Sequence, residues 1–334
     1  MELIILGSSG AIPIKGRNLP SIALKYKNEI LLFDCGEDLQ RAFEKASLKF
    51  NRPLKIFISH FHGDHVIGLP GLLFRFGLLD RTAPVEIYGP RNLFYYLFLH
   101  SKILGLRAPY PLTVKEIDPE NEKLLIFEGL KTDTPAGEQV IEDDIIYESK
   151  RYFMKYTLVK HSILSFAFAF HEKPRFGKFN PEKAEELGIP PSNLWKKMQH
   201  GETITHQGNI IDPLEEGIVG PPRPGKKITY SGDLAPCESI IRLGKDTDIL
   251  IHEATYAKDL ADVAAEKFHS TSVDAATDAL KMNAKKLILT HFSSRYNSPD
   301  ILLKEAKEIF PNTILAEDQL KLKLRWVSMV NLSD

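Results

Sequence analysis

Several short apolar segments of this chain each end in a histidine or an aspartate, and this recurrence constrains the fold more than any other feature. In the first, residues 54–58 predict a buried strand that runs directly into Ser-His-Phe-His-Gly-Asp-His at positions 59–65. The mostly apolar residues 66–76 then predict a packed helix. The polar cluster therefore lies where a strand ends and a helix begins, which is the usual place for a site in an α/β fold.

The side chains of this cluster can bind two neighbouring metal ions. His60 and His62 alternate as on an extended backbone, so both rings can point the same way. Gly63 allows a sharp turn that presents Asp64 and His65 to a second point. Imidazole nitrogen and carboxylate oxygen suit zinc, with manganese or iron as alternatives. The competing interpretation is a chance histidine-rich loop, which the following segments argue against.

Three later segments repeat the arrangement. Strands are predicted for residues 227–230, 248–251 and 286–289. They lead into Ser231-Gly232-Asp233, His252-Glu253-Ala254-Thr255 and Thr290-His291 respectively. A single aspartate at the end of a strand is usually a helix cap, but the repetition predicts a shared site along one edge of the sheets.

Three further residues are candidates because of where they stand. His161 follows a predicted strand at 156–160. Considered by itself it would be interpreted as a core or surface histidine, but the repeated pattern of polar residues at strand ends favours a metal ligand. Asp34 ends a predicted strand pair and either binds metal or braces a ligand. His269 precedes a helix predicted from Val273 to Met282. The positive helix end would lower its pKa, and a neighbouring carboxylate would oppose that.

Composition limits the kind of protein. The chain has 334 residues, of which 43% are apolar and 26% charged, typical of a soluble protein with a sizeable core. Its net charge of −1 excludes a general polyanion binder, so any contact with nucleic acid must come from local patches. No apolar run approaches the length of a membrane span. With only Cys35 and Cys237, there is no disulfide framework, and we expect a cytoplasmic protein with no membrane contact.

Regions outside the recurrent segments suggest substrate contacts. Lys15, Arg17 and Asn18 lie in a glycine-bearing loop and could hold a phosphate or a base edge; a solvated loop is the alternative. Residues 115–150 are acid-leaning and are expected to be a surface elaboration. Residues 173–226 are polar, rich in proline and glycine, and predict an arm rather than a second domain, with short helices at 181–187 and 194–200.

The arm also carries cations and an aromatic residue. Such residues suit a nucleic-acid backbone with an exposed base, although a mixed-charge loop is the simpler interpretation. They are Lys173, Arg175, Lys178, Trp195, Lys196 and Lys197.

Together these residues resemble the metallo-β-lactamase superfamily, whose His-X-His-X-Asp-His motif is matched by residues 60–65. The closer resemblance is to the tRNase Z family, which removes the 3′ trailer of precursor tRNA. Its Pro-X-Lys-X-Arg-Asn loop is similar to residues 13–18, and its other motifs recur in the same order. They are Phe33-Asp34-Cys35-Gly36-Glu37, residues 219–226, Ser231-Gly232-Asp233, His252-Glu253-Ala254-Thr255, His269-Ser270-Thr271 and residues 289–296.

The resemblance implies a fold and a site. The fold would be a single α/β domain over residues 1–334, an αββα sandwich with a protruding arm. Two zinc ions per chain are implied, with manganese or another divalent metal possible. His60, His62 and His161 would hold one ion, Asp64, His65 and His291 the other, and Asp233 would bridge them.

The resemblance also implies roles in catalysis and binding. Asp64 would orient the attacking water or take its proton, and His269, held by Glu253, would protonate the leaving oxygen. Asp34 would orient a ligand histidine. Lys15, Arg17, Asn18, Ser294 and Arg295 would contact the substrate. The partners implied are precursor tRNA and a second copy of the chain in a homodimer.

The sequence departs from the family at several places. The family's Gly-Glu-Gly-Thr-Gln motif appears at residues 36–40, but with Asp38-Leu39 in place of its Gly-Thr. Ser192-Asn193 replaces a glycine-proline pair of the arm. Lys160 and Ser162-Ile163-Leu164 make unusual surroundings for His161, and the 115–150 region is longer than usual. Two alternatives stay open: a related metallohydrolase of small phosphodiesters or other esters, and a non-catalytic RNA-binding scaffold.

Overall fold

Two β-sheets form the framework of the protein. The structure is a computed structural model that describes residues 1–324, and the chain divides into two compact units. The first unit comprises Met1–Tyr147, Met154–Ala169 and the described chain from Ile228 onward. The second comprises Glu148–Phe153 and Phe170–Lys227.

The nine-stranded sheet has its parallel strands at the centre and antiparallel strands on both sides. In spatial order it contains β18 (Lys321–Lys323), β1 (Glu2–Gly7), β2 (Ser21–Tyr26), β3 (Glu29–Phe33), β4 (Leu54–Phe57), β5 (Val85–Pro90), β6 (Leu112–Asp118), β7 (Lys123–Glu128) and β8 (Gly137–Val140). Strands β3 to β6 pair in parallel, with Phe33 opposite Phe57 and Phe57 opposite Tyr88. Their carboxyl ends therefore lie at one edge of the sheet.

The seven-stranded sheet has its parallel strands on one side. Its spatial order is β17 (Thr313–Leu315), β16 (Leu287–Thr290), β15 (Ile249–Glu253), β14 (Lys227–Tyr230), β11 (Ser165–Glu172), β10 (Tyr152–Val159) and β9 (Ile145–Glu148). Strands β14 to β17 are parallel. Strands β14, β15 and β16 are nearly continuous runs of buried residues, as expected for parallel strands covered on both faces.

Aromatic side chains join the two sheets. Phe168 of β11 packs on Phe33 and Phe57, the last residues of β3 and β4, with ring centroids 6.5 and 5.6 Å apart. Tyr230, the last residue of β14, lies 5.7 Å from Phe33. This buried layer fixes the strand ends of one sheet against those of the other, immediately before the polar residues of both.

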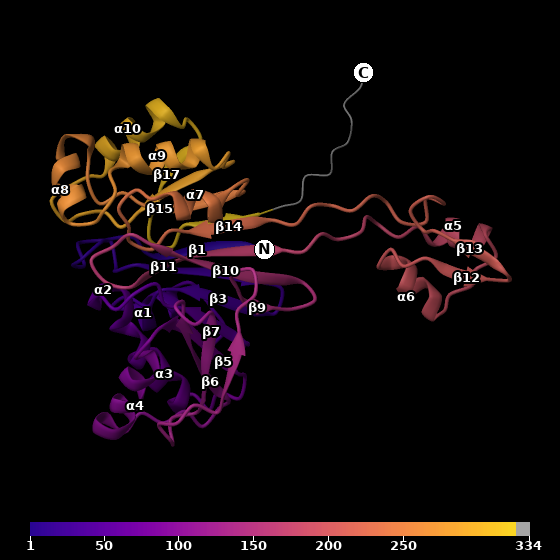
Figure 1. Ribbon diagram of the computed structural model, residues 1–334, viewed down its shortest axis with the longest axis horizontal. Coiled ribbons are helices and arrows are strands. Elements are labelled where there is room, and N and C mark those ends of the chain that lie inside the picture. Colours follow the sequence, from indigo (N-terminus) through magenta and orange to yellow (C-terminus); the bar gives the residue numbers. More distant parts are fainter. Residues whose placement is uncertain (325–334) are drawn as a thin grey trace. The chain divides into compact units, whose positions relative to one another are not determined.

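Helices cover the outer faces of the two sheets (Figure 1). Those on the nine-stranded sheet are α1 (Leu39–Lys45), α2 (Gly63–Val66), α3 (Gly68–Leu78) and α4 (Leu93–Leu104), and most of their buried residues belong to one apolar core. Those on the other sheet are α7 (Glu238–Gly244), the 3-10 helix η1 (Lys258–Leu260), α8 (Ala261–Glu266), α9 (Ser272–Lys281) and α10 (Asp300–Ile309). The order of layers is αββα, which confirms the predicted fold class.

The second unit contains its own short elements. They are α5 (Pro181–Glu186), α6 (Asn193–Gln199), and a hairpin of β12 (Ile204–His206) and β13 (Asn209–Ile211). The side chain of Ser192 accepts a hydrogen bond from the amide of Leu194, so the residue that departs from the family pattern caps α6. The two short helices expected in the arm are thus present, each displaced by one residue or less at its start.

The structure adds detail to two expectations about the peripheral regions. The arm has a small core of its own, formed by Ala184, Ile189, Met198, Ile204, Ile211 and Ile218. Residues 115–150 are only in part a surface elaboration, because they supply β7, β8 and β9 and most of β6. Leu124 and Ile146 are fully buried there, whereas β8 is exposed along its length. Charged residues alternating with these apolar ones concealed the strands.

No helix within residues 1–324 has the length and the apolar character that crossing a bilayer requires.

Candidate metal centre

The ends of the parallel strands present histidines and aspartates to one point of the first unit. His60 and His62 follow β4, Asp233 follows β14 and His291 follows β16. Gly232 has φ of +59°, and a Cβ there would lie 2.9 Å from the carbonyl oxygen of Phe166. Only glycine fits this turn, which directs Asp233 into the space between the sheets.

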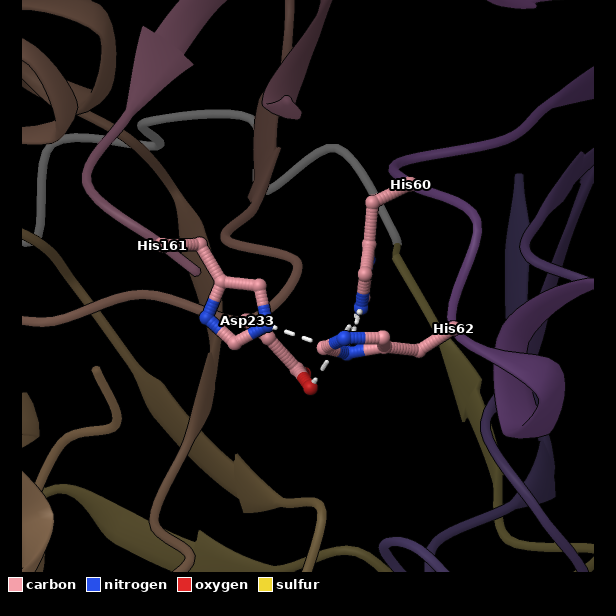
Figure 2. A group of neighbouring side chains, drawn as sticks. All are labelled: His60, His62, His161 and Asp233. Carbon is pink, nitrogen blue, oxygen red and sulfur yellow. Dashed lines mark hydrogen bonds and ion pairs between the residues drawn. The ribbon is translucent and has the colours of Figure 1, made fainter. Parts of the chain in front are cut away.

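One group of ligand-type atoms comprises His60, His62, His161 and Asp233 (Figure 2). The Nδ1 atom of His62 is 3.1 Å from Nε2 of His60 and 3.2 Å from Nε2 of His161. Oδ2 of Asp233 is 3.7 Å from Nε2 of His60. Lys160 pairs with Ala235 across an antiparallel bridge, which brings His161 beside Asp233.

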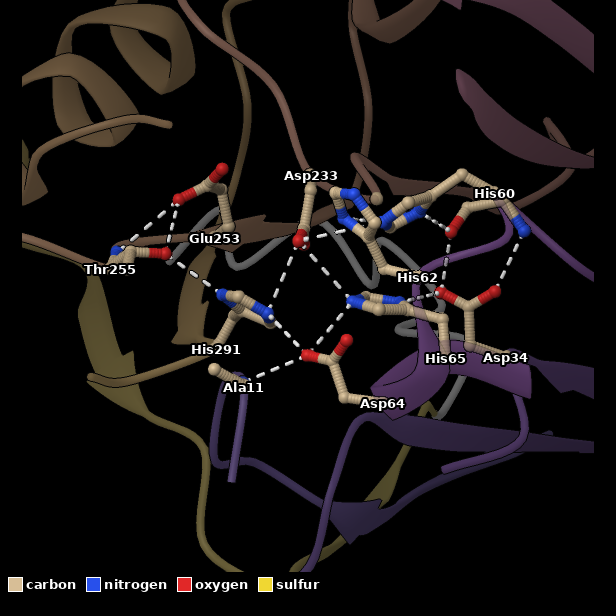
Figure 3. A network of polar contacts seen from close by, with 12 residues as sticks. Ala11, Asp34, His60, His62, Asp64, His65, Asp233, Glu253, Thr255 and His291 are labelled. Atoms are coloured by element: carbon tan, nitrogen blue, oxygen red, sulfur yellow. Dashed lines mark hydrogen bonds and ion pairs between the residues drawn. The ribbon is translucent and has the colours of Figure 1, made fainter. Parts of the chain in front are cut away.

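A second group comprises Asp64, His65 and His291, and it shares the same oxygen of Asp233 (Figure 3). Oδ2 of Asp233 lies 3.3 Å from Nε2 of His65 and 3.2 Å from Nε2 of His291. Oδ2 of Asp64 lies 3.6 and 3.3 Å from the same two nitrogens. The structure thus brings together all seven residues expected as metal ligands, in the two groups expected.

These spacings fit bound metal. Ligand atoms ~2.0–2.1 Å from a tetrahedral zinc ion are about 3.3–3.4 Å from one another, close to the spacings in both groups. Nε2 of His65 is buried and has no hydrogen-bond partner among residues 1–324, which is costly unless a cation takes that place. The residues therefore form a candidate site for divalent metal.

The second ring nitrogen of most of these histidines is held by another group, as is usual for metal ligands. The Nδ1 atom of His60 lies 2.9 Å from Oγ of Ser59, and that of His65 lies 2.7 Å from Oδ2 of Asp34. The Nδ1 atom of His161 lies 2.8 Å from the carbonyl oxygen of Phe268, and that of His291 lies 2.8 Å from Oγ1 of Thr255. These bonds leave Nε2 of each ring to face the centre.

Asp34 has the place expected of a group that orients a ligand. Its carboxylate is fully buried and accepts hydrogen bonds from the amide and hydroxyl of Ser59 and from the hydroxyl of Tyr230, each at 2.7 Å. With the bond to His65, it ties β3, β4 and β14 together. The roles of Ser59 and Tyr230 were not predicted, although both are polar residues next to the end of a buried strand, which was the available signal.

The ionisation of His60 and Asp233 suits cation binding. Burial is the main cause that lowers the pKa of His60 well below its usual value, and the neighbouring imidazoles add to it. Burial would raise the pKa of Asp233, but His291 and His65 hold it well below the ordinary range. At neutral pH the ring of His60 is therefore neutral and the carboxyl of Asp233 ionised, the forms that bind metal.

His269 and Glu253 form a pair beside the second group. Nδ1 of His269 lies 2.8 Å from Oε1 of Glu253. Burial lowers the pKa of His269, but the charge and hydrogen bond of Glu253 raise it to about 9. The opposing carboxylate considered from the sequence thus outweighs burial, which is the main cause that lowers this pKa. Glu253 also accepts hydrogen bonds from the amide of Leu234 at 2.9 Å and the hydroxyl of Thr255 at 2.6 Å.

The residues expected to contact substrate have different surroundings. Lys15 and Ser294 are exposed. Arg295 is exposed as well, and its guanidinium lies 4.7 Å from the ring centroid of Tyr256. Arg17 and Asn18 are half-buried and are hydrogen bonded within the chain. Only part of this set is therefore available as free surface groups.

Known proteins resemble this chain along nearly its whole length. Ribonuclease Z of Nitrosopumilus maritimus is 36% identical, over 97% of this chain and 100% of the relative. The ribonuclease Z of Bacillus licheniformis is 37% identical, over 95% and 97%. This chain belongs to the ribonuclease Z family. The model of a family described as "Anti-Pycsar protein Apyc1" also matches residues 1–110 of this chain.

A solved structure agrees with this membership. The crystal structure of human tRNase Z, short form, superposes with a TM-score of 0.65 at 26% identity, covering 98% of this chain and 100% of that one. A metallo-β-lactamase fold protein of Bacillus subtilis superposes with a TM-score of 0.64 at 16% identity, covering 96% of this chain and 99% of that one, so this chain has the fold that the resemblance in the sequence implied.

Proposed function

We propose that this protein is a zinc-dependent endoribonuclease that removes the 3′ trailer from precursor tRNA. Membership of the ribonuclease Z family supports the reaction class. The observation that carries the proposal is the position of Oδ2 of Asp233, which is within 3.7 Å of Nε2 of His60 and within 3.3 Å of Nε2 of His65 and His291. One carboxylate oxygen shared by two ligand groups is suited to a two-metal phosphodiesterase.

Two zinc ions bound there would polarise the scissile phosphate and supply a nucleophile from water at neutral pH. His60, His62 and His161 would hold one ion and Asp64, His65 and His291 the other, with Asp233 between them. Asp34 would keep Nε2 of His65 directed at its ion through the bond to Nδ1. Manganese or another divalent ion is an alternative that the same ligand set accepts.

The side chains of the centre suggest which groups would transfer protons. Asp64 would orient the attacking water or accept its proton. The amide of Ala11 donates to Oδ2 of Asp64 at 2.8 Å and so fixes the carboxylate. His269 would deliver a proton to the 3′ oxygen of the departing ribose, and Glu253 holds the ring and favours its protonated form.

One experiment separates this function from its alternatives. The metal-loaded protein is incubated with a precursor tRNA bearing a 3′ trailer and, in parallel, with bis(p-nitrophenyl) phosphate, and bound metal is counted by mass spectrometry. We expect a single cleavage at the trailer junction and about two metal ions per chain. Cleavage of the small diester alone would indicate a related metallohydrolase, and no bound metal would indicate a scaffold.

We further propose that the second unit binds the tRNA. Its exposed cations support this: Lys178, Lys196, Lys197 and Arg223 are all at the surface. Trp195 does not serve as a free stacking platform, because it donates to the carbonyl of Ile189 and packs 5.1 Å from the ring of Phe179. Binding there would depend on phosphate contacts rather than on this ring.

A homodimer and a cytoplasmic location complete the proposal. Large apolar side chains exposed on α3 and α4 support self-association, among them Leu78 (83% exposed), Ile103 (74%) and Leu104 (61%). Sedimentation equilibrium of the native chain and of Ile103→Lys tests this. A monomeric native chain at micromolar concentration would refute the homodimer.

A further inference from the structure

The loop that follows β1 packs directly on two of the candidate metal ligands. The amide of Ala11 donates to Oδ2 of Asp64 at 2.8 Å. A Cβ at Gly10 would lie 2.5 Å from Cε1 of His291, so the glycine backbone rests against that ring. Figure 3 shows Ala11, Asp64 and His291 on one side of Asp233. The loop is thus a wall of the metal position formed by Asp64, His65 and His291.

The same loop also holds the backbone that carries His291. The amide of Gly10 donates to the carbonyl of Phe292 at 3.0 Å, and the amide of Phe292 donates to the carbonyl of Ser8 at 3.1 Å. His291 has φ of +60°, a left-handed conformation that a non-glycine residue keeps only where its surroundings enforce it. The bonds between Phe292 and the loop are part of that enforcement.

Arg17 fixes the loop from its other end. Its Nη1 donates to Ser8 Oγ at 2.7 Å and to the carbonyl of Ala316 at 2.6 Å, and its guanidinium lies 5.0 Å from the ring centroid of Phe292. Asp318 completes the arrangement by accepting from Ser8 Oγ at 2.8 Å and from the amide of Asn18 at 2.7 Å. Arg17 therefore contacts both partners of the Ser8–Phe292 backbone bond.

We infer that Arg17 is a positioning residue for the metal position of Asp64, His65 and His291, acting through Ser8 and Phe292. This inference rests on the proposed metal centre and deepens it. It assigns a different task to a residue whose charge and loop position suggested a substrate contact. Lys15, two residues earlier, is exposed and has no side-chain contact among residues 1–324, so it is the matched control.

The test measures metal affinity apart from catalysis. Arg17→Ala, Asp318→Asn and Lys15→Ala are each stripped of metal and titrated with zinc against a chromogenic chelator. Their affinity for precursor tRNA is measured in the metal-free state. Loss of a group that supports a metal ligand typically weakens metal binding ~10–100-fold. We expect Arg17→Ala to lower the affinity for one of the two zinc ions by that factor and Asp318→Asn to lower it by a smaller factor. Lys15→Ala should leave the affinity for both zinc ions unchanged.

The results that overturn the inference are distinct. If Arg17→Ala binds both zinc equivalents like the native chain but binds precursor tRNA more weakly, Arg17 is an RNA contact. If Arg17→Ala fails to fold, Asp318→Asn decides, because it keeps the side-chain shape; unchanged zinc affinity in that variant refutes the inference. A native chain that binds zinc but does not cleave precursor tRNA would refute the proposed function and leave this inference standing.

Discussion

Replacing His269 by alanine should abolish most cleavage of precursor tRNA while leaving the metal centre intact. A general acid acts in the transition state, so the loss should appear in kcat with little change in KM. Such assistance is typically worth ~10²–10⁴-fold, about 3–5 kcal/mol of transition-state stabilisation. We expect the upper part of that range, because Glu253 holds the ring at 2.8 Å and raises its pKa to about 9, which keeps it protonated at neutral pH.

The choice of substrate makes this prediction specific. A ribose 3′ oxygen is a poor leaving group that needs the proton, whereas nitrophenolate leaves almost unaided. Single-turnover cleavage of a labelled precursor tRNA should therefore fall by ~10³-fold or more, and hydrolysis of bis(p-nitrophenyl) phosphate by much less. His100→Ala removes an imidazole from α4 as a matched control and should change neither rate.

A different outcome would refute the acid role. His269 also lies with Asp233 and His291 in a group whose ligand-type atoms are within 4.8 Å of one another. If His269→Ala loses metal and both substrates suffer equally, the residue is a metal ligand or a support for one, and the proton must come from elsewhere.

Three further perturbations have defined outcomes. Asp233→Ala should remove metal from both positions and abolish activity on both substrates, and full activity with normal metal content would refute the shared-oxygen arrangement. Excising residues 178–219 should weaken tRNA binding and spare hydrolysis of the small diester. The two ends can be joined directly, because Gly177 and Gly220 already share a 3.0 Å hydrogen bond. Equal losses on both substrates would mean that the arm has a structural role. Asp278→Ala should lower the free energy of unfolding in urea by roughly 3–5 kcal/mol, because it leaves buried His252 unpaired; a change under about 1 kcal/mol would contradict this.

The centre could be predicted far better than the periphery, and the reason is physical. A buried parallel strand is a continuous apolar run, and the polar residues within a few positions of its end must face either water or a partner. His60, Asp233 and His291 were found in this way. Residues 115–150 escaped the same reasoning because buried positions in their strands are interspersed with half-buried and exposed ones, as in β7, and the charged residues suggested a surface segment.

Contacts between residues distant in the sequence could not be predicted. Arg17 and Asn18 looked like substrate contacts because the pattern records only their types. Their partners Ala316 and Asp318 lie about three hundred positions later and belong to no recognisable motif. Trp195 was likewise grouped with residues that suit nucleic acid, but its ring packs against the small core of the second unit. In each case tertiary packing decided what local composition left open.

Glu253 shows how such contacts assemble the candidate centre. Its two oxygens accept from the amide of Leu234, which follows Asp233, from His269, and from Thr255, whose hydroxyl reaches Nδ1 of His291. One buried carboxylate therefore holds the backbone beside Asp233, the ring of His269 and, through Thr255, the ring of His291. Asp34 does the same for His65 and, through Ser59, for His60. Since each carboxylate fixes ligands of different strands, removing either should disturb both metal positions, whereas removing one terminal histidine should disturb only its own.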